Sequence, residues 1–131
     1  MGHKYLENLA TYQPPYSFEA PSDERKPEWR VEQAVYGFDS TETWSLDTYF
    51  YAWLYERLRM YKEKASEIVN LHFHVFTFKG KEYYQDELID MMCERIEYYF
   101  SEDFDDWDEE DFEKIKEIGE IWAIVLPSMW W

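Results

Sequence analysis

Three carboxylates and one tryptophan lie close together between positions 39 and 47 of the chain. They are Asp39, Glu42, Trp44 and Asp47. On a helix, Trp44 and Asp47 would share a face, and an aromatic ring beside carboxylates can hold a cation or the edge of a base. A simpler interpretation is structural: Asp39 and Glu42 have the spacing of a capping box, and acids are favourable near a helix N-terminus. Trp44 would then pack into the core, and this second interpretation is the favoured one.

Residues 101–113 form a second distinctive segment, SEDFDDWDEEDFE, in which carboxylates alternate with aromatic rings. Evenly spread carboxylates with interleaved aromatics can imitate the phosphates and bases of a nucleic-acid strand. Phe104 and Trp107 are the candidate anchors of such a surface, since buried aromatics dominate interface energetics. The alternative is a solvated loop that leads into a helix whose first turn favours acids. The candidate binding residues of this segment are Asp103, Phe104, Asp105, Asp106, Trp107, Asp108 and Glu109.

Weaker candidates for metal chemistry come from paired acids on two expected helices. Paired carboxylates on antiparallel helices can hold Mg²⁺ facing a diphosphate. The four residues are Glu63, Glu67, Glu87 and Asp90. The arrangement is similar to the all-α nucleoside-triphosphate pyrophosphatases, but the first pair has E-x-x-x-E spacing where that family has E-x-x-E. His72 and His74 would share a strand face and could ligate zinc, although the sequence places no third ligand.

The charge of the chain limits its partners. Its 29 acids and 13 bases give a net charge of −16, which repels phosphate backbones and anionic membranes and attracts basic surfaces. The chain contains no P-loop, dinucleotide-binding, Cys-x-x-Cys or G-x-S-x-G motif. We therefore expect a non-enzymatic protein without a cofactor, whose partner is a basic protein and which binds neither nucleic acid nor membrane directly.

Aromatic residues make up 21% of the chain, which is more than one small core can hide. Some aromatic surface should be exposed or covered, and a homodimer is one way to cover it. The single cysteine, Cys93, lies in a helical apolar pattern and should be a buried, inert thiol. The lack of an apolar leader and of disulfide partners favours the cytoplasm.

The elements that must position these residues are mainly helical. Apolar residues recur at steps of three and four, which predicts a small bundle with helices at about 41–68, 85–100 and 109–126. An alternating pattern and a Lys-Gly-Lys turn predict a short β-hairpin near 71–84. Residues 1–30 are expected to form a short helix and an extended proline-rich arm, and residues 31–131 a single acidic domain.

The segment that opens the long helix also resembles something known. It matches the pattern G-[FWY]-[SD]-x-x-[DE]-x-W-[SND]-[LF]-D of a loose family of small, uncharacterised proteins from bacteriophages and mobile elements. The matching residues are Gly37, Phe38, Asp39, Glu42, Trp44, Ser45, Leu46 and Asp47. The resemblance implies a phage setting in a bacterial host and a helical fold, with no settled activity.

Two functions remain open from the sequence. The first is a phage protein that binds and inhibits a host factor through its acidic aromatic surface, as an anti-CRISPR-like protein or DNA mimic would. The host factor would be a nucleic-acid-handling defence protein. The second is a nucleotide binder or Mg²⁺-dependent nucleotide hydrolase that uses Trp44 and its neighbouring carboxylates.

Overall fold

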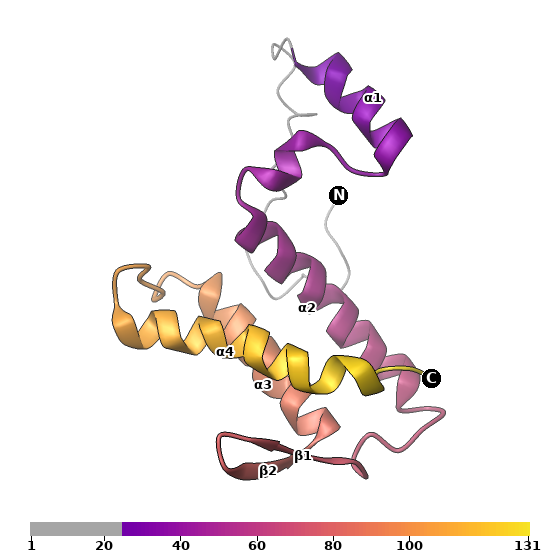
Figure 1. The fold of residues 1–131 in the computed structure, drawn as a ribbon, viewed down its shortest axis with the longest axis vertical. Helices are drawn as coiled ribbons and strands as arrows, with labels where there is room; N and C mark the ends of the chain where they lie inside the picture. The colour runs from indigo at the N-terminus through magenta and orange to yellow at the C-terminus, as the bar shows by residue number, and fades with distance from the viewer. Residues whose placement is uncertain (1–24) are drawn as a thin grey trace.

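The computed structural model describes residues 25–131, so the helix and most of the arm expected within residues 1–30 lie outside the described part. Four helices are described: α1 (Lys26–Tyr36), α2 (Leu46–Ala65), α3 (Gln85–Tyr99) and α4 (Glu109–Val125). Two short 3-10 helices, η3 (Ser40–Thr43) and η4 (Leu126–Ser128), flank α2 and α4. Strands β1 (Val75–Phe78) and β2 (Lys81–Tyr84) form one hairpin. The mainly helical class with a small hairpin is thus confirmed (Figure 1).

Helix α1 was not expected from the sequence, which predicts an extended arm as far as residue 30. Pro27 lies in the first turn of this helix, where its missing N–H costs nothing and its φ suits the helix. Gly37 ends the helix with a φ of 83°, and its N–H donates to the carbonyl oxygen of Gln33. A proline that the pattern treats as a breaker therefore starts a helix.

The long helix expected over 41–68 is shorter than predicted at both ends. The capping box at Asp39 starts η3, and the N–H of Trp44 donates to the carbonyl oxygen of Thr41 rather than to a residue four positions back. The α-helix proper starts at Leu46 and ends at Ala65, after which the N–H groups of Ile68 and Val69 both donate to the Ala65 carbonyl.

The hairpin has a two-residue turn at Lys79 and Gly80, both at positive φ (50° and 77°). Such a turn matches the twist of paired strands. Val75 pairs with Tyr84 and Phe78 with Lys81, and Phe78 is buried in the core. The strands are shorter than the predicted range 71–84, and His72 and His74 precede β1 rather than lie on it.

The core is centred on α3, which packs against both α2 and α4 (Figure 1). Burial raises the pKa of the Cys93 thiol in this core to about 12, which agrees with the expected inert cysteine. The fully buried side chains include Leu54, Leu58, Leu88, Met92, Ile96, Ile118 and Ile121. The N-terminal end of α2 carries η3 and α1, away from the hairpin (Figure 1).

Glu117 ties the hairpin to two helices. Its carboxylate on α4 lies 3.0 Å from the Lys79 ammonium and 3.3 Å from the Arg95 guanidinium of α3. Burial alone would raise the pKa of Glu117, but the hydrogen bond from Lys79 and the charge of Arg95 outweigh it and lower the pKa.

Within residues 25–131, no helix is both long enough and apolar enough to cross a bilayer.

Candidate functional site

Asp39 and Glu42 form the capping box that their spacing predicts. Oδ1 of Asp39 accepts hydrogen bonds from the N–H of Thr41, at 2.8 Å, and from its hydroxyl. Oε2 of Glu42 accepts one from the N–H of Asp39 at 2.7 Å. Gln33 of α1 donates to the other oxygen of Asp39 at 2.7 Å, so the box also joins α1 to η3. Both carboxylates are buried and serve the local fold.

Trp44 does not pack into the core, and the prediction that it would is wrong. Its side chain is 52% exposed, and its ring meets the edge of buried Trp29 at a centroid distance of 5.5 Å. The Arg25 guanidinium lies 5.0 Å from the Trp44 ring centroid and 4.9 Å from that of Trp29. The cation beside Trp44 is thus supplied by the chain itself. Asp47 is exposed and accepts a 2.8 Å hydrogen bond from the Tyr99 hydroxyl.

The four weak metal candidates are not brought together. Glu87 accepts a hydrogen bond from the Tyr84 N–H at the start of α3, and Asp90 forms a 2.6 Å ion pair with Lys62. Glu63 and Glu67 are exposed at the C-terminal end of α2. In the part of the chain that the structure describes, no three His, Cys, Asp or Glu side chains form a group that could hold a metal ion.

The acidic run 101–113 divides into residues that hold the loop and residues that face solvent. Asp108 caps α4 by accepting from the N–H groups of Glu110 and Asp111. Oδ2 of Asp111 accepts from the Asp105 N–H at 2.9 Å, and Oδ1 accepts from the Tyr98 hydroxyl at 2.9 Å. This last bond, with the charge of Asp111, raises the pKa of Tyr98 to about 12.

Phe104 helps to hold the loop in place and is not part of the exposed surface. Its ring is half-buried and packs against Tyr98 and Tyr99, with centroid distances of 6.2 and 5.0 Å. The sequence placed Phe104 beside Trp107 as a second anchor. In the structure it fastens the loop to the end of α3.

Trp107, in contrast to Phe104, faces solvent. Its side chain is 94% exposed, the highest value among the large apolar side chains that the structure describes as exposed. Its N–H donates to Oδ1 of Asp105 at 2.9 Å, so the backbone is held while the indole faces solvent. Phe112, one turn into α4, is also exposed. A shallow depression of about 380 Å³ is lined by Asp106, Trp107, Asp108, Glu109, Phe112 and Glu113. We call these six residues the acidic aromatic face.

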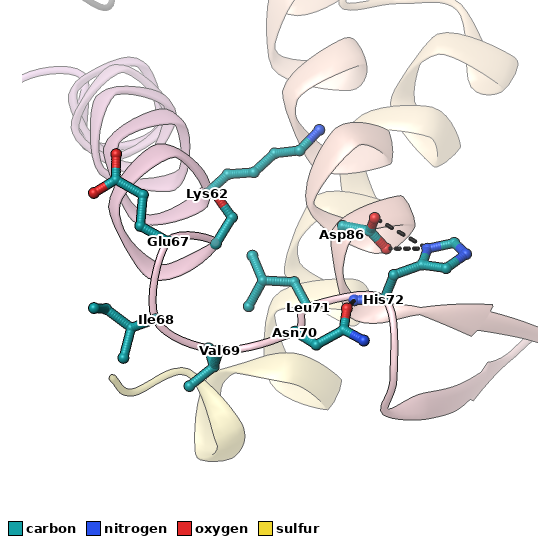
Figure 2. A pocket seen from close by; sticks show the side chains of 9 residues that line it. Lys62, Glu67, Ile68, Val69, Asn70, Leu71, His72 and Asp86 are labelled. Carbon is teal, nitrogen blue, oxygen red and sulfur yellow. Dashed lines mark hydrogen bonds and ion pairs between the residues drawn. The ribbon is translucent and has the colours of Figure 1, made fainter.

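A second surface lies at the other end of the core, in the loop between α2 and β1. Nδ1 of His72 lies 3.0 Å from Oδ1 of Asp86, and the His72 ring packs on Tyr84 at 3.8 Å. Figure 2 shows this pair across a pocket from the end of α2, with the loop through Val69, Asn70 and Leu71 running beneath it. Sequence reasoning considered His72 only as a metal ligand and gave no signal for Asp86, because the pair forms across the hairpin.

The chain matches no protein-family model, no curated protein and no solved structure. The resemblance of residues 37–47 to a phage-protein pattern therefore stays a prediction. What the structure defines is a small helical protein with an acidic and aromatic surface, on a loop held by hydrogen bonds at one end of the core.

Proposed function

We propose that this chain is a non-enzymatic binding protein of phage or mobile-element origin. It acts in the host cytoplasm, where its acidic aromatic face docks on the basic nucleic-acid-binding surface of a host defence protein and blocks it. The observation that carries the proposal is the 94% exposure of Trp107 between carboxylates, on a loop whose backbone is held.

Covering the exposed indole of Trp107 with a partner would remove a large apolar surface from water, which is favourable. Trp is among the residues that contribute most to binding energy when an interface buries it. The carboxylates around Trp107 supply the charge pattern that steers a basic partner and keeps anionic competitors away. A nucleic-acid strand offers the same combination of anionic groups and flat apolar rings.

The way the loop is held also supports binding. Asp105, Asp108 and Asp111 use their carboxylates to fix the backbone around Trp107. A preorganised loop loses little conformational freedom on association, so more of the contact energy remains as affinity. Exposed acids that make no such bonds, including Asp106 and Glu113, remain to face the partner.

The test compares two sets of neutralised acids in a pull-down from a bacterial host extract. One variant carries Asp103→Asn, Asp106→Asn, Glu109→Gln and Glu113→Gln at or beside the face. Its matched control carries four exposed substitutions elsewhere: Glu28→Gln, Glu67→Gln, Glu82→Gln and Glu94→Gln. Both lose the same charge. A further pair compares Trp107→Ala with Trp131→Ala.

The proposal expects one basic nucleic-acid-binding protein to be retained by the wild type and by both controls. Binding of that protein should weaken as salt rises, and added duplex DNA should release it. The face variant and Trp107→Ala should retain at least tenfold less, since an interface hot spot contributes about 2 kcal/mol or more. Equal loss in the control quartet would mean that only net charge matters, and would contradict a specific face.

A further inference from the structure

A pocket distinct from the acidic aromatic face lies between the α2–β1 loop, the start of α3 and the C-terminal tail. Its volume is about 270 Å³. It shares Val69, Asn70 and Leu71 with the pocket of Figure 2, so this loop separates the two. The lining consists of Tyr61, Val69, Asn70, Leu71, Phe73, His74, Gln85, Ser128 and Trp130.

Aromatic rings dominate the rim of the pocket. Phe73, in the loop before β1, and Trp130, in the tail after η4, are each 74% exposed. Tyr61 contributes a half-buried ring from α2, and Leu71 is buried. Exposed aromatic rings around an apolar floor are suited to stacking on a flat ring, and base–aromatic stacking tolerates many ring types.

Gln85 places a buried amide in this apolar surrounding. The residue is 4% exposed, yet its hydrogen bonds within the protein are long. Its Nε2 donates to Oγ of Ser128 at 3.2 Å and to the Ser128 carbonyl at 3.5 Å, and its Oε1 accepts from the Tyr61 hydroxyl at 3.4 Å. The 3.2 Å bond lies at the long end of the usual range, and the other two lie beyond it. A buried amide so weakly bonded has hydrogen-bonding capacity left for a ligand.

The charge of the lining restricts the ligand further. As far as the structure describes the chain, the lining contains no Asp, Glu, Lys or Arg. His74 is the one side chain of this lining that can carry a positive charge, and a phosphate would also meet the net charge of −16. Pockets for drug-sized ligands start at about 300 Å³, so this one suits a single ring system.

From these observations we infer that the pocket binds one uncharged, planar nitrogen heterocycle, of the size of a free nucleobase or nicotinamide. The ring stacks against the aromatic rim, and the Gln85 amide bonds to a ring nitrogen or its substituent. This site is independent of the acidic aromatic face, and its test does not depend on the identity of a protein partner.

Calorimetric titration with adenine, cytosine and nicotinamide tests the inference on the full chain, with adenosine monophosphate as the charged comparison. At least one heterocycle should bind with a Kd at or below about 1 mM, and the phosphorylated compound should bind at least tenfold more weakly than adenine. Trp130→Ala and Phe73→Ala should each weaken binding about tenfold. Both residues are largely exposed, so circular dichroism should show an unchanged fold.

Trp131→Ala is the matched control, because Trp131 is exposed next to Trp130 and lies outside the lining. It should leave the affinity unchanged. The inference is overturned if none of the three heterocycles binds saturably, or if Trp131→Ala weakens binding as much as Trp130→Ala. It is also overturned if N-acetyltryptophan amide binds while the heterocycles do not, since the pocket would then accept a peptide side chain.

Discussion

The Tyr98 hydroxyl at the C-terminal end of α3 donates a 2.9 Å hydrogen bond to Asp111 in the first turn of α4. The other oxygen of Asp111 accepts from the backbone of Asp105, between the two helices. One carboxylate therefore joins both helix ends to the loop that carries Trp107. The orientation of the acidic aromatic face depends on this link.

Replacing Tyr98 with Phe should loosen the loop without unfolding the helices. The carboxylate of Asp111 would lose one of its two partners, and the Asp105 N–H should then exchange faster with solvent. Amide hydrogen exchange followed by NMR measures this at Asp105, with Ile118 in the core of α4 as the internal reference. Unchanged exchange at Asp105 would mean that the Tyr98 hydrogen bond does not help to hold the loop.

Replacing Asp39 with Ala should destabilise the protein by about 1–2 kcal/mol, the usual effect of losing an N-cap. The upper end is expected because Asp39 is buried and also accepts from Gln33. Asp39→Asn keeps a good capping group and should lose less. Chemical denaturation measures both, with the exposed Asp106→Ala as control. If Asp39→Ala is as stable as the control, the capping box does not stabilise α1 and η3.

Alkaline pH should destabilise the fold through groups buried in their neutral form. Burial raises the pKa of Cys93 from 9.0 to about 12, and burial, with the charge of Glu97, raises the pKa of Tyr55 from 10.0 to about 12. Groups whose folded pKa is raised contribute stability below the unfolded pKa and lose it as pH rises toward the folded value.

The free energy of unfolding should therefore start to fall near pH 9, by at most about 1.4 kcal/mol per pH unit for each titrating group. Unfolding by guanidinium chloride at several pH values between 8 and 11 measures this loss of stability. Cys93→Ala should remove the part of the loss that starts at pH 9. A thiol reagent should react with Cys93 only after denaturation. Rapid reaction of the folded protein would contradict the burial of Cys93.

Exposed apolar side chains on and after α1 lead us to expect self-association. Val31, Val35 and Tyr36 are exposed on this helix, and Phe38 follows it. An apolar patch of this kind often marks an interface. We expect the wild type to form a dimer at tens of micromolar and Val31→Glu/Val35→Glu to be a monomer, as measured by light scattering. Ala123→Glu on α4 adds charge away from the patch and should stay dimeric. A monomeric wild type would defeat this prediction.

Local patterns predicted most of the fold because they act over a few residues. Helices α3 and α4 follow from apolar spacing, and the hairpin follows from the change of period and the turn at Gly80. The pattern failed at Trp44 because the capping-box spacing of Asp39 and Glu42 can open a 3-10 helix as well as an α-helix. It failed at Pro27 because a proline that breaks a helix and one that starts it look alike in sequence.

For the candidate site too, the sequence predicted some features and not others. Composition alone pointed to residues 101–113, but which acids fix the loop depends on Tyr98, and the burial of Phe104 depends on Tyr99. No sequence pattern indicated the pocket beside Gln85. Its rim joins Phe73 to Trp130, residues from segments that only the packed fold brings together.

Helix α2 gives the molecule a built-in spacer. At 1.5 Å per residue, its 20 residues span about 30 Å between the end that carries α1 and the end near the hairpin. Partners held at the two ends would be kept at a set separation by a rod rather than by a flexible linker.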